Sequence, residues 1–448
     1  MQMLSLFPQG FINSYADRIG GEAVSRWGNK YVIGLTGNIA VGKSVVRQML
    51  QHLGAYTIDA DGLAHQAMAP GAPAYKPIVD TFGQFILNPD KTINRSMLAS
   101  IVFANPEALR KLEAITHPVV GQAIDTLVKR AKQRVVVIEA IKLLEGSLAE
   151  SVNAVWVVDA KPQTQFARLT GKRKMAPEEA KKRIIGQNPQ ADKVKAAQVV
   201  IRNDGNIEET WKQVHAAWKQ VEQQLKPAAL QPPVQPAKSQ APTPQPLQPA
   251  PARPAKPQPQ PRAARPPESP QPSAEDPSPA PAVDTSGVTV RRGMPSNAEA
   301  IADFISRQSG QSVGRMDVIM AFGQKSYLLA ETDSVKPAGV IGWQVENLIT
   351  RADELYVAAG PQMERVVYAL IQAIEEASRE LQSEVSFVFL AADARPELAQ
   401  PFLNSGYEVT TVQEIKIPAW REAVQEILQD GTQLLTKKLR RDRVLKPI

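Results

Sequence analysis

The sequence predicts an α/β protein with two globular regions, and three observations indicate this fold class. Apolar runs rich in β-branched residues alternate with amphipathic stretches over residues 31–225, and a similar alternation resumes near residue 283. Between them, residues 227–282 hold 20 of the chain's 37 prolines, mixed with Gln, Ala and Ser. Such a segment has too little to bury to offset its ordering entropy. We therefore predict a disordered, polyproline-like linker over 226–282 and leave open that its PxxP spacings bind an SH3-type domain.

The first globular region, 31–225, reads as a parallel sheet covered by helices on both faces. Strands are expected at 31–36 (YVIGLT), 55–58, 134–138 (RVVVI) and 154–158 (AVWVV), with helices at 43–53 and 210–225. Runs of β-branched residues separated by helical stretches are typical of such a sheet. Residues 1–30 are interpreted as an N-terminal extension.

The second globular region, 283–448, is predicted to be an α+β domain. Strands are expected at 288–291, 339–345 (GVIGWQV) and 385–390 (VSFVFL), with a further strand after residue 407. Helices are expected at 297–308 and 362–381. The basic tail, 434–448, is expected to pack or lie on the surface, without a ligand.

Composition excludes several classes of site. The 448 residues include no cysteine and only four histidines, so disulfides, thiol nucleophiles and a His-rich metal site are not expected. No apolar run approaches the roughly 20 residues of a membrane helix, and the first residues lack a signal-peptide pattern. The net charge of +7 is spread along the chain. We expect a cytoplasmic protein that binds neither nucleic acid nor membrane.

Residues 37–44 (GNIAVGKS) match the phosphate-loop pattern G-x-x-x-x-G-K-[ST] without a mismatch. Glycines allow backbone N–H groups to turn toward a phosphate, and the following helix directs its positive end at the same anion. Lys43 would bridge the β- and γ-phosphates of ATP, and Ser44 would be a Mg²⁺ ligand. A chance match is disfavoured because the motif lies between a strand and a helix. The predicted nucleotide site comprises Gly37, Asn38, Ile39, Ala40, Val41, Gly42, Lys43 and Ser44.

Two carboxylates follow the second predicted strand, at Asp59 and Asp61. Because the carboxyl ends of parallel strands meet at the ligand crevice, Asp61 is expected near the γ-phosphate. There it would accept a proton from an attacking hydroxyl. The alternative is that one of the two aspartates only caps the helix that follows.

The same region resembles dephospho-CoA kinase over residues 31–220. The resemblance depends on an ordered set of pieces: IGLTGNIAVGKS, the DAD segment at 59–61, INRSMLASIVF at 93–103, the pair 117–118, LLE at 143–145, VVDAKPQTQFARL at 157–169, Gln187 and the NDG segment at 203–205. It implies transfer of the ATP γ-phosphoryl group to the ribose 3′-hydroxyl of dephospho-CoA, with Mg²⁺. Asp61 then matches the proposed base.

The resemblance also implies further site residues. His65, Arg95 and His117 would bind the acceptor, and Asn203 and Gly205 would lie near the adenine. A cationic lid over the phosphates would contain Arg168, Lys172 and Arg173. Two plainer interpretations stay open, a solvated basic helix face for the lid residues and helix-surface packing for Arg95 and His117.

Several positions depart from the family pattern. Asn38 stands where a second glycine is usual, His65 where Arg is common, and Lys172 where the lid arginine is expected; residues 141–142 and Gln198 also differ. Because Lys and Arg are not equivalent at a bidentate phosphate contact, the rate and substrate affinity are put in doubt. The departures leave Lys43 and Asp61 in place.

The second globular region resembles a GNAT-type acetyltransferase fold. The pieces are VRRGMPSNAEAIADFI at 290–305, GVIGW, LYV at 355–357 and PFLNSGYE at 401–408. In the stretch expected to bind acetyl-CoA, Arg365 and Val367 replace small residues, and we expect Val367 to obstruct the phosphates. A degenerate domain kept for binding, regulation or self-association is therefore favoured.

Two alternatives to an ATP:dephospho-CoA phosphotransferase remain. One is a regulatory protein whose phosphate loop senses ATP. The other is a bifunctional kinase and acetyltransferase, which Arg365 and Val367 disfavour. The presence of Lys43, Ser44 and Asp61 together favours the enzyme, because a sensor needs no base.

Overall fold

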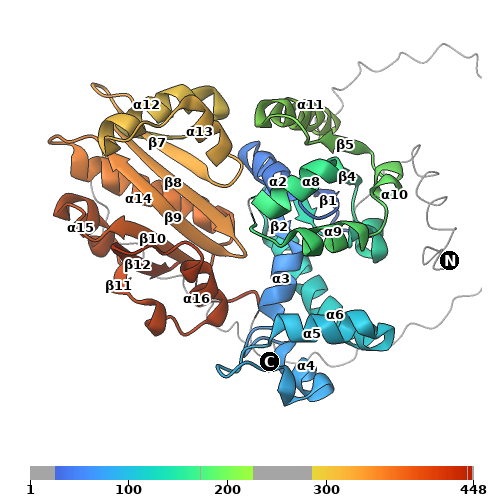
Figure 1. The fold of residues 1–448 in the computed structure, drawn as a ribbon. Helices are drawn as coiled ribbons and strands as arrows, with labels where there is room; N and C mark the ends of the chain where they lie inside the picture. Colours follow the sequence, from blue (N-terminus) through green and yellow to red (C-terminus); the bar gives the residue numbers. More distant parts are fainter. Residues whose placement is uncertain (1–25, 172, 226–284, 441, 446–448) are drawn as a thin grey trace, which may run out of the picture.

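Two sheets, each in its own domain, form the protein in a computed structural model that describes residues 26–171, 173–225, 285–440 and 442–445 (Figure 1). The predicted linker and most of the predicted N-terminal extension lie outside the described residues, as does Lys172. Within the described ranges, no helix combines the length and apolar content needed to cross a membrane.

The first domain is a five-stranded sheet in the order β2-β3-β1-β4-β5, with every pair parallel. Buried β-branched residues fill both faces, which confirms the predicted parallel sheet. The strand β5 was missed by the sequence reading. The elements are β1 (Tyr31–Thr36), α2 (Lys43–His52), β2 (Tyr56–Asp59), α3 (Ala60–Ala67), α4 (Tyr75–Phe82), α5 (Arg95–Ala104), α6 (Pro106–Arg130), β3 (Val135–Glu139), α7 (Leu148–Ser151), β4 (Ala154–Asp159), α8 (Pro162–Gly171), α9 (Pro177–Ile185), α10 (Gln190–Lys195), β5 (Val199–Arg202) and α11 (Ile207–Leu225).

The second domain is a seven-stranded mixed sheet in the order β11-β12-β10-β9-β8-β7-β6, parallel only between β9 and β10. The predicted α+β class is confirmed. The elements are β6 (Val288–Arg292), α12 (Ala298–Ser309), α13 (Arg315–Ala321), β7 (Ser326–Thr332), β8 (Gly339–Glu346), β9 (Ile349–Val357), α14 (Met363–Glu380), β10 (Val385–Ala391), α15 (Pro396–Asn404), β11 (Glu408–Thr410), α16 (Pro418–Gln425) and β12 (Thr432–Lys438).

The C-terminal tail packs into the protein, which is one of the two placements expected for it. Its first part forms β12, which pairs with β10 and β11 inside the sheet, with Leu434 and Leu435 buried. The strand β12 was not predicted, because basic residues follow the apolar pair Leu434 and Leu435, which packs inward. Farther on, Leu445 is 3% exposed and joins the hydrophobic core of the first domain.

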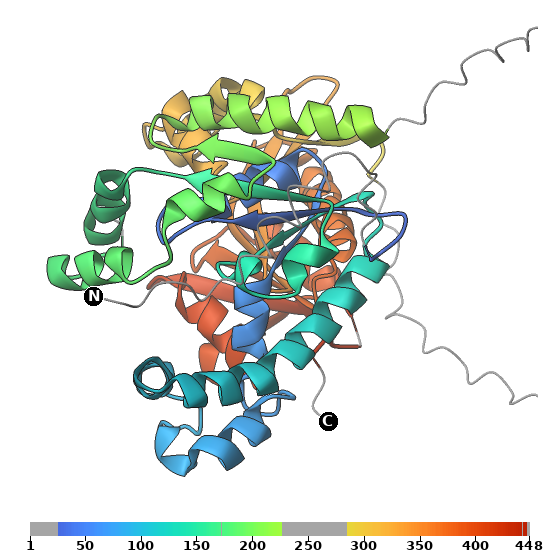
Figure 2. The same cartoon turned by 90° about the vertical axis from the view of Figure 1, so that its right-hand side faces the viewer.

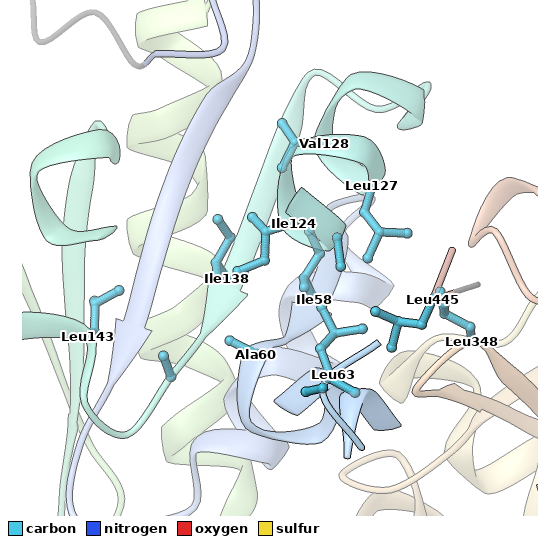
Figure 3. Close-up of a cluster of buried hydrophobic side chains, with 14 of the residues drawn as sticks. Ile58, Ala60, Leu63, Ile124, Leu127, Val128, Ile138, Leu143, Leu348 and Leu445 are labelled. Atoms are coloured by element: carbon cyan, nitrogen blue, oxygen red, sulfur yellow. The ribbon is translucent and has the colours of Figure 1, made fainter. Parts of the chain in front are cut away.

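The two domains pack directly on one another. Leu348, in the turn between β8 and β9, is 6% exposed and lies beside Leu63 and Leu445 (Figure 3). Viewed from the side, the second domain lies behind the first domain's sheet (Figure 2). Burial of these leucines contributes apolar stabilisation to the interface.

Candidate active site

The phosphate loop joins β1 to α2 and holds an unusual backbone conformation. Gly37, Ala40 and Gly42 have φ values of 150°, 58° and 99°. A Cβ on Gly37 would lie 2.4 Å from Val158 O, and one on Gly42 would lie 2.1 Å from Asn203 Nδ2. Both motif glycines are therefore required by conformation and by space.

Lys43, the first residue of α2, lies buried against the loop. Its Nζ donates to Gly37 O at 3.1 Å and to Asn38 O at 3.2 Å. Burial lowers the pKa of Lys43, while the nearby carboxylates Glu139 and Asp61 act in the opposite direction. The ammonium group is thus positioned at the loop among negative charges.

Three residues of the segment 187–190 form hydrogen bonds with the phosphate loop. Ile39 N donates to Gln187 Oε1 at 2.8 Å, and Asn38 N donates to Gln190 Oε1 at 3.0 Å. Asn38 Nδ2 donates to Asn188 O at 3.2 Å. Asn38, which replaces the usual glycine, is therefore held by side-chain and backbone contacts, and the role of Gln190 was missed by the sequence reading.

A buried carboxylate at the end of β3 was also missed. Ser44 Oγ donates to Glu139 Oε1 at 3.4 Å, and Arg47 Nε donates to Glu139 Oε2 at 2.7 Å. Burial raises the pKa of Glu139, and Arg47 counters that effect. An apolar strand ending in an acidic residue, VVVIE, was the available signal, because strand ends gather at the same edge of the sheet.

Asp59, the last residue of β2, and Asp61, in the first turn of α3, make different contacts. Asp59 is the N-cap of α3, and its Oδ1 accepts a hydrogen bond from Gly62 N at 2.9 Å. Asp59 therefore caps the helix, as the alternative had it for one of the two aspartates, and Asp61 is not the cap.

Asp61 lies on the first turn of α3, near enough to Lys43 for each charge to affect the pKa of the other. Its Oδ2 accepts a hydrogen bond from Ile141 N at 3.1 Å. Desolvation raises the pKa of Asp61, with Asp59 adding to the rise, while Lys43 and Lys193 oppose it. Lys193, which the sequence reading missed, is 6% exposed and thus places a second buried ammonium beside this carboxylate.

Asn203, expected near the adenine, and Arg168, expected in the lid, both contact the phosphate loop. Asn203 is buried, and its Nδ2 donates to Val41 O at 2.8 Å. Arg168 donates from Nη1 to Ala40 O at 3.1 Å and to Val41 O at 2.9 Å, and from Nη2 to Asn203 O at 2.7 Å. Arg168 therefore joins the phosphate loop to the segment that contains Asn203.

Arg173 and Gly205 are the other described residues that were predicted for the lid and for the adenine contact. Arg173 is exposed, follows α8, and is near enough to lower the pKa of Lys43. Gly205 lies after β5, where a Cβ would meet Glu209 Oε2 at 1.9 Å. A larger residue at 205 would force that glutamate to move.

A cavity of about 710 Å³ opens beside Asp61. Its first-domain wall includes His65 and Arg95, which contact each other at 2.8 Å between Arg95 Nη1 and His65 Nδ1. Burial and the Arg95 charge lower the pKa of His65. His117 is exposed on α6 and does not line this cavity, so only two of the three predicted acceptor residues come together.

The start of α14 corrects the steric argument made for the second domain. Val367 is fully buried in that domain's apolar core, packed with residues such as Leu370. Its side chain therefore points away from any anion at the helix start, and it cannot obstruct one.

Comparison with known proteins gives a clear relationship for the first domain. A family model described as dephospho-CoA kinase matches residues 31–209. The dephospho-CoA kinase of Geobacter metallireducens is 47% identical over 192 residues, an alignment that covers 42% of this chain and 96% of that relative.

Two solved structures resemble one domain each. TT1252 from Thermus thermophilus is 28% identical; the superposition covers 44% of this chain and 99% of TT1252, with a TM-score of 0.39. A putative acetyltransferase from Salmonella typhimurium, solved with acetyl-CoA, is 12% identical. The superposition covers 36% of this chain and 100% of the acetyltransferase, with a TM-score of 0.28. These TM-scores are too low to support an argument, so the GNAT-type resemblance stays a prediction.

Proposed function

The chain belongs to the dephospho-CoA kinase family, and we propose that it transfers the γ-phosphoryl group of ATP to the ribose 3′-hydroxyl of dephospho-CoA. The family relationship confirms the predicted kinase. The proximity of Lys43 in the phosphate loop to the carboxylate of Asp61 is the observation that carries the proposed reaction. A nucleotide sensor would need the lysine but not the carboxylate, so the sensor alternative is not favoured.

Each group has a separate role in this proposal. The loop amides and Lys43 bind the β- and γ-phosphates, while Asp61 accepts the proton of the 3′-hydroxyl as the new O–P bond forms. A raised pKa brings the carboxylate of Asp61 closer to the operating pH, which suits a general base. Arg173 would add positive charge where the transferring phosphoryl group is most anionic.

Mg²⁺ would fit this site as an ion carried by ATP. Ser44 Oγ and the carboxylate of Glu139, which are 3.4 Å apart, offer the oxygen ligands that Mg²⁺ prefers. No group of three or more His, Asp or Glu residues suited to a metal occurs in the described part of the chain. Ser44 and Glu139 would hold the ion together with phosphate oxygens and water, and the ion would neutralise phosphate charge.

The decisive experiment is ADP release by the purified full chain with ATP and dephospho-CoA, with coenzyme A identified in parallel. Asp61→Asn keeps an acceptor for Ile141 N and should lower kcat about 10²- to 10⁴-fold while ATP still binds. Asp80→Asn, at an exposed position on α4, is the matched control and should retain the wild-type rate. ATP binding without ADP release in the wild type would replace this proposal with the sensor.

Other expectations stay predictions. These are a cytoplasmic location, self-association through the second domain, the absence of nucleic-acid and membrane binding, and the lack of acetyl transfer. The roles assigned to Asn203, Gly205, Arg168 and Lys172 are likewise proposals.

A further inference from the structure

The cavity beside Asp61 has two walls, and the second domain supplies one of them. Arg351, Arg421 and Glu422 line it opposite His65 and Arg95 of the first domain. A volume of about 710 Å³ falls within the range of sites that enclose small molecules. Residues of both domains therefore border the cavity that opens beside Asp61.

This wall is fixed to the first domain at several points. Gln66 Nε2 on α3 donates to Asn347 O at 2.5 Å, and Gln382 Nε2 donates to Leu127 O at 2.8 Å. Leu348 is buried in the same interface, where Figure 3 shows it beside Leu63 and Leu445. Because α3 also carries Asp61, the second domain is held in a defined position relative to the reacting group.

A carboxylate of the second domain forms an ion pair with Arg95, the arginine predicted to bind the acceptor. Glu422 Oε1, on α16, accepts a hydrogen bond from Arg95 Nη2 at 2.8 Å. The side chains of Arg95 and Glu422 are 49% and 66% exposed, so solvent weakens the pair. An incoming anionic group could therefore displace Glu422 from Arg95 at small cost.

Arg421 is the cation on this wall that is suited to an anionic ligand. Its Nε and Nη2 donate to Ile415 O at 3.2 and 2.8 Å, and its Nη1 has no partner among the described residues. Asp90 of the first domain also lines the cavity; hydrogen bonds from Thr92 lower the pKa of Asp90, and the nearby charge of Arg421 adds to that effect. Arg351, in contrast, is buried and paired with Glu346 at 2.6 Å and Glu426 at 2.9 Å.

From this arrangement we infer that the second domain forms part of the acceptor site, with the diphosphate of dephospho-CoA bound between Arg95 and Arg421 and Glu422 displaced. The inference rests on the proposed function. A kinase domain alone would lack Arg421, so the fused domain contributes to acceptor affinity. Guanidinium groups on both sides suit a diphosphate, because Arg421 Nη1, and Arg95 Nη2 once Glu422 has left, can each donate a charge-assisted hydrogen bond to it.

Steady-state kinetics of the full chain test this inference, with dephospho-CoA and ATP varied separately. Glu422→Gln should lower KM for dephospho-CoA about threefold, because loss of the competing carboxylate is worth less than 1 kcal/mol. Arg421→Gln should raise it about tenfold, the loss expected for a charge-assisted hydrogen bond. Arg421→Lys should recover part of that loss, and KM for ATP should stay constant in all three.

Glu397→Gln, at an exposed position on α15 outside the cavity, is the matched control and should behave as the wild type. If Arg421→Gln unfolds because the bonds to Ile415 are lost, the gain in affinity expected for Glu422→Gln still tests the site. An active wild type with Glu422→Gln unchanged or weaker for dephospho-CoA would overturn the inference. A wild type that releases no ADP would instead overturn the proposed function.

Discussion

His52 makes the contact between the two domains sensitive to acid. Its ring lies edge-on to Phe322 of the second domain, with centroids 5.3 Å apart. Because Nδ1 lies 2.7 Å from Gln48 O, it carries the proton of the neutral ring and donates to that oxygen. Nε2 is buried without a partner in the described structure, so protonating it introduces an unsatisfied charge.

Burial lowers the pKa of His52 from 6.5 to about 4, and the nearby Arg292 adds to that effect. The folded protein therefore binds fewer protons than the unfolded chain between these two values. The stability contributed by neutral His52 is complete above pH 6.5 and is lost as the pH falls toward 4. At about 1.4 kcal/mol per pH unit, the loss over this window is about 3 kcal/mol.

Urea unfolding followed by tryptophan fluorescence at pH values from 7 to 4 measures this loss. His52→Asn is the comparison, because its amide can still donate to Gln48 O and does not titrate. Carboxylates titrate in both proteins, so the difference in unfolding free energy isolates the histidine. A difference that stays constant between pH 7 and pH 4 would refute the reasoning.

Three further changes probe the interface and the site. Gly62→Ala places a Cβ 2.0 Å from Asn347 Oδ1, so thermal unfolding should show a loss of about 1–3 kcal/mol, and an unchanged Tm would contradict the close approach. Leu348→Ala should cost about 2–4 kcal/mol in urea unfolding, because the side chain is 6% exposed; a loss below 1 kcal/mol would mean that the turn is not buried in solution. Arg47→Met leaves Glu139 buried without this ion pair and should destabilise by about 3 kcal/mol in urea unfolding; a loss below about 1 kcal/mol would contradict the importance of the pair.

Local patterns in the sequence were enough to predict the nucleotide side of the site. The strand before the phosphate loop, the loop itself and the helix after it are continuous in the chain. Lys43 and the pair of aspartates at the end of the second strand could therefore be predicted to lie near one another, since parallel strands place their carboxyl ends together. The short strand β5 was missed because four residues carry too little periodicity.

Tertiary structure decided what surrounds those groups. Gln190 reaches the loop from 152 residues away, and Glu422 reaches Arg95 from 327 residues away. Such contacts leave no periodic signal, because they depend on how two folded surfaces fit. The sequence by itself therefore determined a kinase domain, a proline-rich segment and a second α+β domain. Only packing of the β8–β9 turn against α3 decided that the second domain borders the acceptor cavity, because burial of Leu348 fixes that wall in place.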